Sequence, residues 1–278
     1  MKEKFDLHVH SNLSDGLETR KKLIEIAKSK NFQVLAFTDH NISGMDVTTG
    51  LQKLAGDTEL ISGIEIDCGL PFRMHILGYY LIDGKKIDDI LEQNLLENEE
   101  RCYQIVRNLN ARYNFNITDE DIQKFKTKYF TKRDINHILL DKKIINHIYE
   151  ASNKYMGQET PDYIPMKKVS SKEALQLILN SGGIPVLAHP VTVFRDQTLE
   201  KFEPLLRKLV NGGLMGIEVV NKREDNKFQE YFLLLARKYH LITTVGTDFH
   251  RFNRDEFGVE LEPEKVLYPL LELGKKRR

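Results

Sequence analysis

Two short motifs rich in histidine and aspartate, near opposite ends of the sequence, most strongly limit how this chain can fold. They are DLHVH at residues 6–10 and GTDFH at residues 246–250. Each lies at the end of an apolar run with the length of a strand, and residues i and i+2 of a strand point to the same face. The motifs therefore predict polar side chains that converge on one point, in a fold that brings both ends of the chain together.

Similar residues end other apolar runs between these motifs, namely His40, Glu65, His75 and His189. Six of the nine histidines are placed at expected strand ends. Imidazoles gathered in one basin repel one another once they are protonated, unless a cation holds them, so the pattern indicates a metal site. The other three histidines occur in helical patterns and are interpreted as ordinary residues: His137, His147 and His240.

Seven apolar runs are expected to form strands, and helical patterns separate many of them. This alternation is typical of an α/β barrel or a doubly wound sheet with parallel strands. The length of 278 residues fits one barrel or two average domains. In either fold, the carboxyl ends of parallel strands share one basin. The seven runs are residues 5–10, 34–38, 60–67, 72–80, 184–188, 216–220 and 242–246.

Residues 88–165 interrupt this alternation. They are charged, mostly helical in pattern and contain no convincing strand, so we expect an inserted helical domain that serves as a candidate substrate-recognition cap. The α/β domain then comprises residues 1–87 and 166–278. A basic run from Lys124 to Arg133 within the insertion is interpreted either as a solvated helix face or as a phosphate-binding surface.

The charge balance and the cysteine count exclude several classes of protein. The chain has 41 Lys and Arg and 41 Asp and Glu, so its formal net charge is +0 with neutral histidines. Long duplex nucleic acid is held by an excess of positive charge, which argues against that partner. Two cysteines are too few for a disulfide framework, and the sequence shows no signal-peptide core or apolar span. We expect a cytoplasmic protein without a membrane partner, and its oligomeric state stays open.

The motifs resemble those of the PHP (polymerase and histidinol phosphatase) superfamily over nearly the whole chain. The resemblance implies a distorted (β/α)7 barrel, here with the inserted helical domain, and three divalent metal ions at the carboxyl ends of the strands. It is carried by HVHS at 8–11, SDG at 14–16, TDH at 38–40, Glu65, His75, AHP at 188–190 and DFH at 248–250.

The resemblance also implies which residues bind each ion. Imidazole combined with carboxylate suits Mn²⁺, Zn²⁺ or Fe²⁺, whereas Mg²⁺ and Ca²⁺ prefer all-oxygen sites, and the choice among the first three stays open. For the three ions in turn, the implied ligands are His8, His10, Glu65 and Asp248; Glu65, His75 and His189; and Asp15, His40 and His250.

Such a centre is suited to phosphoester hydrolysis, because cations activate water and neutralise phosphate charge without a Ser or Cys nucleophile. Asp248, Glu65 and His189 are the expected catalytic residues at the metals. Arg133 is expected to act with them by gripping a second substrate phosphate through its guanidinium group. A surface ion pair of Arg133 with Asp134 or another acid is the alternative.

Within the superfamily, the chain most resembles the group of nucleoside-3′,5′-bisphosphate phosphatases and RNase AM-like exonucleases. The insertion of that group carries an Arg-Pro-His segment, and here residues 132–135 keep Arg133 but lack the Pro-His pair. Arg195 and Lys222 follow expected strand ends and are further candidates for substrate binding. The implied substrates are small phosphorylated nucleotides, such as nucleoside 3′,5′-bisphosphates or AMP, and short RNA degraded from 5′ to 3′.

Two further carboxylates lie near the expected site. Asp39 precedes His40 and is expected either to orient an imidazole or to hydrogen-bond the backbone at the strand end. Glu218 ends an expected strand and is not assigned to a metal.

Three other functions fit parts of the pattern. A histidinol-phosphate phosphatase would keep the metals and change the substrate, although the inserted domain argues against it. A non-catalytic, metal-bound PHP scaffold or a phosphate-sensing protein would keep the basin without turnover. The complete set of implied ligands favours an enzyme.

Overall fold

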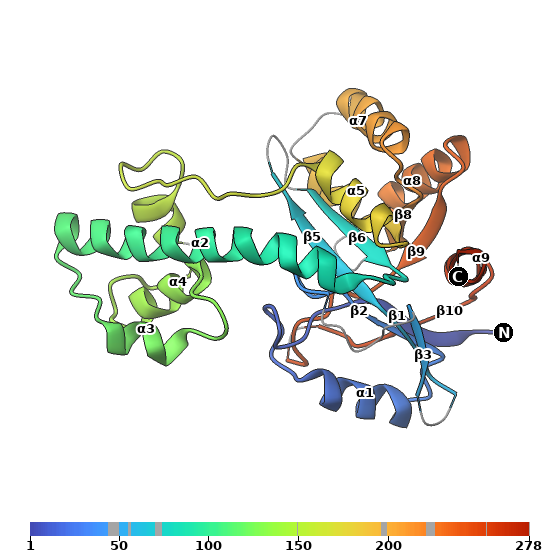
Figure 1. Ribbon diagram of the computed structural model, residues 1–278, viewed down its shortest axis with the longest axis horizontal. Helices are drawn as coiled ribbons and strands as arrows, with labels where there is room; N and C mark the ends of the chain where they lie inside the picture. Colours follow the sequence, from blue (N-terminus) through green and yellow to red (C-terminus); the bar gives the residue numbers. More distant parts are fainter. Residues whose placement is uncertain are drawn as a thin grey trace. The chain divides into compact units, whose positions relative to one another are not determined.

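The computed structural model describes residues 1–43, 50–54, 57–69, 74–148, 150–195, 199–220, 226–253 and 255–277. The chain divides into two compact units, the first formed by Met1–Asp89 with Val169–Arg278 and the second by Ile90–Lys168. All of the described strands belong to the first unit, and the second is helical (Figure 1). The expected α/β class is confirmed.

The first sheet has the order β10-β1-β2-β4-β3. Strand β1 (Glu3–Val9) contains most of the DLHVH motif and pairs in parallel with β2 (Val34–Phe37) and antiparallel with β10 (Val259–Leu261). Strand β2 pairs in parallel with β4 (Glu59–Ile61), and β3 (Leu51–Lys53) adds an antiparallel edge. The carboxyl ends of β1 and β2 therefore lie at the same edge of the sheet.

The second sheet has the order β5-β6-β7-β8-β9. Strands β5 (Gly63–Cys68) and β6 (Met74–Tyr79) form an antiparallel pair, and β6 is also antiparallel to β7 (Ile184–Leu187). Strands β7, β8 (Gly216–Val220) and β9 (Ile242–Val245) run parallel. The amino end of β6 therefore lies beside the carboxyl ends of its two neighbours.

The two sheets are joined by isolated parallel bridges, Val9 with Phe249 and His40 with Glu65. Both bridges involve residues in or next to the motifs, so the sheets meet at the expected site. Within the described residues, the ladders form two sheets and not one continuous ring. The barrel of seven β/α units therefore stays a prediction.

One expected strand, residues 60–67, is wrong as a single element, because it forms β4 and β5 in different sheets. The break falls at Ser62, whose hydroxyl donates to the carbonyl of Leu81 at 3.0 Å. The next residue, Gly63, lies so close to β2 that a Cβ would be 2.5 Å from the Phe37 carbonyl oxygen. Apolar residues continue on both sides of the break and hide it in the sequence. The short strands β3 and β10 were not expected, and residues 70–73 lie outside the described residues.

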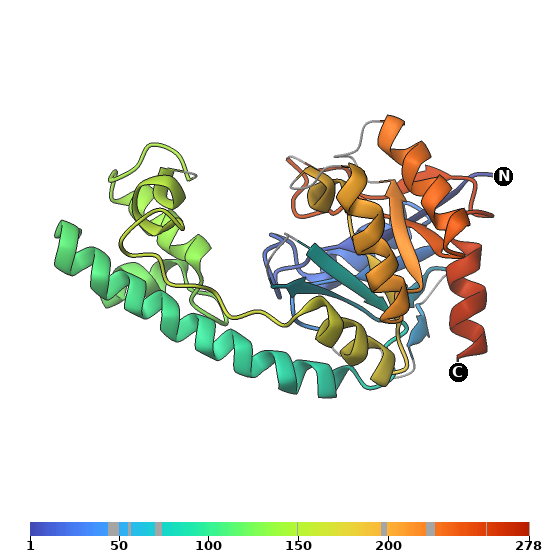
Figure 2. The ribbon, with the colours of Figure 1, turned by 90° about the horizontal axis from the view of Figure 1, so that it is seen from above.

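Helices pack against both sheets of the first unit (Figures 1 and 2). Helix α1 (Arg20–Ser29) packs against β2, α5 (Ser171–Asn180) against β6 and β7, and α8 (Asn226–Lys238) against β8 and β9. Apolar residues at helical spacing explain this packing, since Leu23 and Ala27 of α1 are fully buried. The other helices are α6 (Pro190–Arg195), α7 (Leu199–Asn211) and α9 (Tyr268–Lys276).

The second unit has an apolar core of its own, which includes Ile105, Leu109, Phe130 and Ile138. Its helices are α2 (Gly84–Tyr113), which begins in the first unit, α3 (Asp119–Phe125), α4 (Lys132–Asp141) and the π-helix η1 (Ser152–Met156). Among the described residues, no helix combines the length and the apolar character needed to cross a membrane. The role of this unit as a substrate-recognition cap stays a prediction.

Candidate metal centre

Glu65 of β5 lies at the centre of a buried cluster of imidazoles. Its Oε1 is 2.8 Å from His75 Nδ1 and 2.9 Å from His189 Nε2, and its Oε2 is 3.2 Å from both His10 Nε2 and His40 Nδ1. Burial alone would raise the pKa of Glu65, yet the imidazoles, foremost His40 and His75, hold it well below its usual range. A carboxylate reached from so many sides can be shared between cations.

The first group of candidate ligands is buried and contains His8, His10, Glu65 and Asp248, with ligand atoms within 4.8 Å of one another. Asp248 Oδ1 is 3.2 Å from His10 Nε2 and 3.5 Å from His8 Nε2. Burial alone would lower both histidine pKa values, but the acids raise the pKa of His8 well above its ordinary value and that of His10 to about 10. Where no cation is bound, the nearby acids therefore favour the protonated form of both imidazoles.

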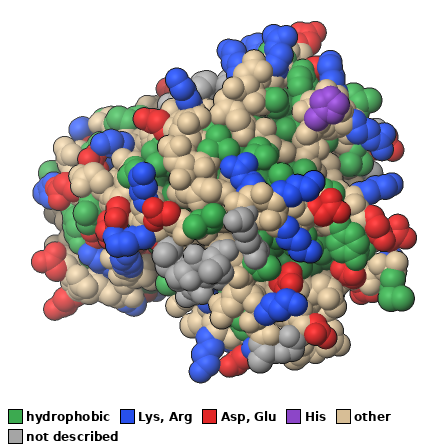
Figure 3. All heavy atoms as spheres, turned by 45° about the vertical axis from the view of Figure 1, so that its right-hand side comes forward, with side chains coloured by type: hydrophobic (Ala, Val, Ile, Leu, Met, Phe, Trp, Pro, Cys, Tyr) green, Lys and Arg blue, Asp and Glu red, His purple; other side chains and the backbone are tan. Residues whose placement is uncertain are grey.

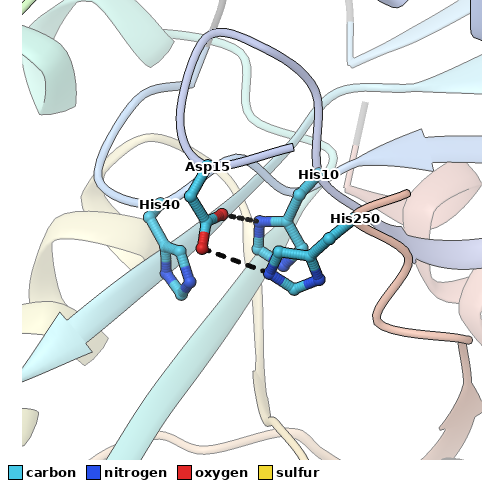
Figure 4. A group of neighbouring side chains, drawn as sticks. All are labelled: His10, Asp15, His40 and His250. Atoms are coloured by element: carbon cyan, nitrogen blue, oxygen red, sulfur yellow. Dashed lines mark ion pairs between the residues drawn. The ribbon is translucent and has the colours of Figure 1, made fainter. Parts of the chain in front are cut away.

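The second group contains His10, Asp15, His40 and His250, and Figure 4 shows Asp15 between His40 and the other two histidines. Asp15 Oδ1 is 3.6 Å from His10 Nδ1, and its Oδ2 is 3.3 Å from His250 Nε2. Burial would raise the pKa of Asp15, but the three histidines hold it below its usual range. His10 thus takes part in two groups, one at each ring nitrogen, whereas the resemblance implied it for the first ion alone.

Two more groups share His75. One contains Glu65, His75 and His189, and the other contains His40, Asp67 and His75. The structure therefore brings all nine residues expected as ligands into one connected cluster and adds Asp67, which sequence analysis did not single out. Its place two residues after Glu65 on the same strand was the available clue. The roles of these residues as ligands stay predictions.

Several buried polar atoms of the cluster have no hydrogen bond of good geometry. Leaving buried polar atoms unpaired is costly, and so many in one place require an explanation. Imidazole nitrogens and carboxylate oxygens are donors that Zn²⁺, Mn²⁺ and Fe²⁺ accept, so the residues fit bound cations. The atoms are His8 Nε2, both ring nitrogens of His10, His40 Nδ1 and Glu65 Oε2.

Glu218 of β8 is fully buried and hydrogen-bonds two residues of the cluster. It accepts a hydrogen bond from His8 Nδ1 at 3.0 Å and one from the backbone N–H of His189 at 2.7 Å. The first of these contacts leaves His8 Nε2 facing Glu65 and Asp248. Glu218 therefore orients one candidate ligand and fixes the backbone of another, which explains the carboxylate that the sequence left unassigned.

Asp6 attaches the loop that carries Asp248 to β1. It accepts hydrogen bonds from the backbone N–H and the hydroxyl of Thr247 at 3.0 and 2.6 Å. Gly246 lies directly against His8, where a Cβ would clash. Asp248 itself has a φ of 52°, which is costly for a residue other than glycine and persists only where its surroundings enforce it.

Asp39 orders the loop that carries Asp15. Its oxygens accept hydrogen bonds from the backbone and hydroxyl of Ser11, from the hydroxyl of Ser14 and from the guanidinium of Arg20. Arg20 and Asp39 form a buried ion pair at 2.6 Å. Of the two expected roles for Asp39, these contacts support bonding at the strand end and the adjoining loop.

Of the three expected substrate-binding residues, Arg133 alone has a side chain within the described part of the chain. Arg133 is exposed in the first turn of α4, within the second unit. Burial raises the pKa of the neighbouring Asp134, and this rise is opposed by hydrogen bonds from Thr131 and, to a smaller extent, by the charge of Arg133. Arg195 ends α6, but its side chain lies outside the described part of the chain, as does Lys222 altogether. The binding roles of all three stay predictions.

The basic run of the second unit is largely paired with acids. Lys124 is 2.7 Å from Asp141, and Lys126 is 2.5 Å from Glu99. On the face that Figure 3 displays, Lys and Arg side chains are interspersed with Asp and Glu. These pairs favour a solvated helix face over a phosphate-binding surface for the run.

Comparisons with known proteins add family information to this geometry. A family model described as PHP domain matches residues 6–219. A 5′-3′ exoribonuclease of Haemophilus influenzae is 26% identical over 253 residues, covering 90% of this chain and 91% of the relative. A phosphoribosyl 1,2-cyclic phosphate 1,2-diphosphodiesterase of Eggerthella lenta is 27% identical over 263 residues, covering 90% and 95%.

A 3′,5′-nucleoside bisphosphate phosphatase of Chromobacterium violaceum is 25% identical over 257 residues, covering 88% of this chain and 86% of the relative. The fold is also similar to that of a Bifidobacterium adolescentis protein provisionally described as a metal-dependent phosphoesterase. The TM-score is 0.76 at 23% identity, with 97% of this chain and 96% of that one covered.

Proposed function

The chain belongs to the PHP domain family, and on that premise we propose that it is a metal-dependent phosphoesterase acting on nucleotides. Its substrates are phosphomonoesters such as nucleoside 3′,5′-bisphosphates or AMP, together with short RNA degraded from 5′ to 3′. The names of two relatives support these substrates, since one is a nucleoside bisphosphate phosphatase and another a 5′-3′ exoribonuclease.

The observation that carries the proposal is the buried Glu65 carboxylate among histidines, because four of their ring nitrogens lack hydrogen-bond partners: His8 Nε2, both nitrogens of His10 and His40 Nδ1. The three ligand groups that contain the nine expected residues support three divalent cations, Mn²⁺, Zn²⁺ or Fe²⁺. When bound, these cations supply Lewis acidity that lowers the pKa of water and neutralises charge on a phosphate.

The residues of this chain divide the remaining work. Glu65, Asp248 and His189 would bind the cations and fix their positions, and they are the catalytic residues of the proposal. Glu218 keeps His8 turned toward them through its hydrogen bond. Because His8, His10 and Glu65 are fully buried, bulk water is excluded from the inner side of the centre.

Substrate recognition is assigned to the helical residues 88–165 and to three basic residues, Arg133, Arg195 and Lys222. An exposed guanidinium at Arg133 suits a second phosphate, because it can bind two phosphate oxygens at once. We further propose that residues 1–87 and 166–278 form the distorted barrel of seven β/α units, which the bridges between the two sheets support. The two buried free cysteines, Cys68 and Cys102, support a reducing cytoplasmic location.

A phosphate-release assay tests the proposal directly. The substrates are adenosine 3′,5′-bisphosphate, AMP, a short 5′-phosphorylated RNA, histidinol phosphate and phosphoribosyl 1,2-cyclic phosphate, each with Mn²⁺, Zn²⁺, Mg²⁺ or a chelator. Because the cyclic diester yields a monoester before free phosphate, and 5′-3′ cleavage of RNA releases nucleoside monophosphates, the loss of these two substrates is followed separately, by phosphorus NMR and by chromatography respectively. We expect metal-dependent turnover of the nucleotide or RNA substrates above the others.

Preference for histidinol phosphate or the cyclic phosphate would replace the proposed substrate and keep the proposed chemistry. Full turnover in chelator would reject that chemistry. The non-catalytic scaffold and the phosphate sensor are both excluded by any metal-dependent release of phosphate from these substrates.

A further inference from the structure

Asp67 stands beside the metal centre in a position set by strand geometry. It lies two residues after Glu65 on β5, so both side chains point to the same face of the strand. In the register of the β5–β6 pair, Asp67 lies directly opposite His75. Directly opposed side chains in an antiparallel pair are close enough to interact. Asp67 is therefore presented to His75 by the backbone itself.

Two hydrogen bonds between Asn41 and the backbone of β5 fix the position of Asp67. Asn41, which follows His40, donates its backbone N–H to the Glu65 carbonyl at 2.8 Å. Its side-chain oxygen accepts the backbone N–H of Asp67 at 3.0 Å. Both carboxylate-bearing residues are thus held relative to His40 by a single asparagine.

The imidazole of His75 is engaged at both nitrogens. Its Nε2 is 2.6 Å from Asp67 Oδ1, and its Nδ1 is 2.8 Å from Glu65 Oε1. A neutral imidazole has one N–H and one lone pair, so only one of the two nitrogens can bind a cation. An acidic side chain at hydrogen-bond distance takes the N–H and leaves the other nitrogen as the ligand.

The same arrangement occurs at His8, where Glu218 accepts from Nδ1 and Nε2 faces Glu65. At His75 the two nitrogens have exchanged these roles, since Nε2 faces the acid Asp67 and Nδ1 faces Glu65. The position beside Nδ1 is also the more suitable one for a cation, because the fully buried Glu65 and the buried His189 contribute ligand atoms to it. Asp67 and His75 are more exposed, with 18% and 23% of their side-chain surface accessible, so Asp67 lies on the outer side of the ring.

We propose that Asp67 is a positioning residue that accepts the Nε2–H of His75 and turns Nδ1 toward the cation position formed with Glu65 and His189. Loss of Asp67 then weakens binding at that position selectively. The inference rests on the proposed metal-dependent function. The competing arrangement makes Asp67 itself a ligand, together with His40 and His75.

Asp67→Ala and Asp67→Asn separate these arrangements, because an amide oxygen still accepts the Nε2–H but is a poor cation ligand. Glu59→Gln is the control, since Glu59 on β4 has a similar side-chain exposure of 23% and lies outside the cluster. Zn²⁺ is titrated into each metal-free protein, and the stoichiometry is checked by elemental analysis. Circular dichroism shows whether each variant is folded.

We expect three ions in the wild type and the control, and an affinity loss of about 10- to 100-fold for one ion in Asp67→Ala. Asp67→Asn should keep three ions with a smaller loss. Side-chain ¹⁵N spectra of the Zn²⁺-loaded wild type should show His75 protonated at Nε2 and bound to metal through Nδ1.

Unchanged binding in Asp67→Ala, an equal loss in Asp67→Asn, or metal bound through Nε2 of His75 would each overturn the inference. If Asp67→Ala does not fold, Asp67→Asn and the wild-type ¹⁵N spectrum still decide. A wild type that binds no cation would reject the proposed function together with the inference, whereas a wild type with three ions and an unaffected Asp67→Ala would reject the inference alone.

Discussion

The two units of this protein use charged side chains in opposite ways. In the first unit, His8, His10 and Glu65 are fully buried, and several of their polar atoms have no hydrogen-bond partner. In the second, exposed lysines such as Lys124 are paired with nearby acids. Burying polar groups without partners is costly, whereas exposed ion pairs contribute little in either direction. The buried cluster with unpaired polar atoms is therefore a better candidate for the functional site than the longer run of paired surface charge.

Removing a central carboxylate should have the largest effect. Asp248→Ala deletes an oxygen 3.2 Å from His10 Nε2, and we expect phosphate release to fall by about 1,000-fold with the fold retained. Glu203→Gln, which changes a half-buried acid of α7 paired with Lys238, is the control. A variant that releases phosphate as fast as the wild type and only melts at a lower temperature would give Asp248 a structural role and reject it as a catalytic residue.

Loss of the supporting carboxylate should be the next largest effect. Glu218→Gln keeps the size of the side chain but weakens the hydrogen bond that orients His8, and we expect metal affinity to fall by about 10- to 100-fold. Calorimetric titration of metal into the chelator-treated protein measures this affinity. Wild-type affinity in the variant would show that Glu218 serves only to pack β8.

Arg133 tests whether the second unit contributes to substrate binding. Arg133→Ala should raise the KM for a bisphosphate by about tenfold and leave the KM for AMP nearly unchanged, because only the former has a second phosphate to lose. Lys124→Ala is the matched control in the same unit. Equal KM values in the wild type and Arg133→Ala would assign this arginine to the solvated surface.

The pH dependence of stability should differ between the metal-free and loaded proteins. The folded-state pKa values of His10 and His75 are raised to about 10, because nearby acids outweigh burial, whereas an unfolded histidine titrates near 6.5. Their contribution to stability is full below about pH 6.5 and is lost as pH rises toward 10. The Tm of the chelator-treated protein should therefore fall by about 2 °C or more between pH 7 and 9.

Bound cations replace those protons, so the loaded protein should show a smaller fall in Tm over the same range. Calorimetric scans of both forms in matched buffers measure the difference. A Tm of the metal-free protein that rises from pH 7 to 9 would contradict the protonated state assigned to these imidazoles.

The smallest effect is expected in the basic run of the second unit. Lys124→Gln removes an exposed ion pair with Asp141, and we expect the free energy of unfolding to change by less than about 1 kcal/mol without an effect on turnover. A loss of RNA cleavage in this variant would restore the phosphate-binding role and weaken the contrast between the two units.

Much of the cluster could be predicted from the sequence, because its residues lie at the ends of apolar runs. Alternation along a strand predicts that His8 and His10 share a face, and parallel strands predict that His40 and His189 meet them. The strands of the second half of the chain were also predictable, since each is a short apolar run between helical patterns.

The roles of the supporting residues could not be predicted, because they depend on strand pairing and register that no local pattern fixes. Glu218 acquires its role from His8, which lies 210 positions earlier, and Asp67 from the register of a hairpin whose turn the sequence does not fix. The break at Ser62 depends on the close approach of Gly63 to β2, which no local pattern reveals. The sequence therefore predicts which residues are ligands, whereas strand pairing and register are needed to explain how those ligands are held in place.

The central claim is that Glu65 and the surrounding histidines form a centre for three cations. Anomalous diffraction from crystals soaked in Mn²⁺ tests it most directly, because each bound ion gives its own peak. The account predicts three peaks, beside the groups centred on Asp248, on Asp15 and on His189. No peak in the cluster after soaking, or histidines found apart from one another, would contradict it.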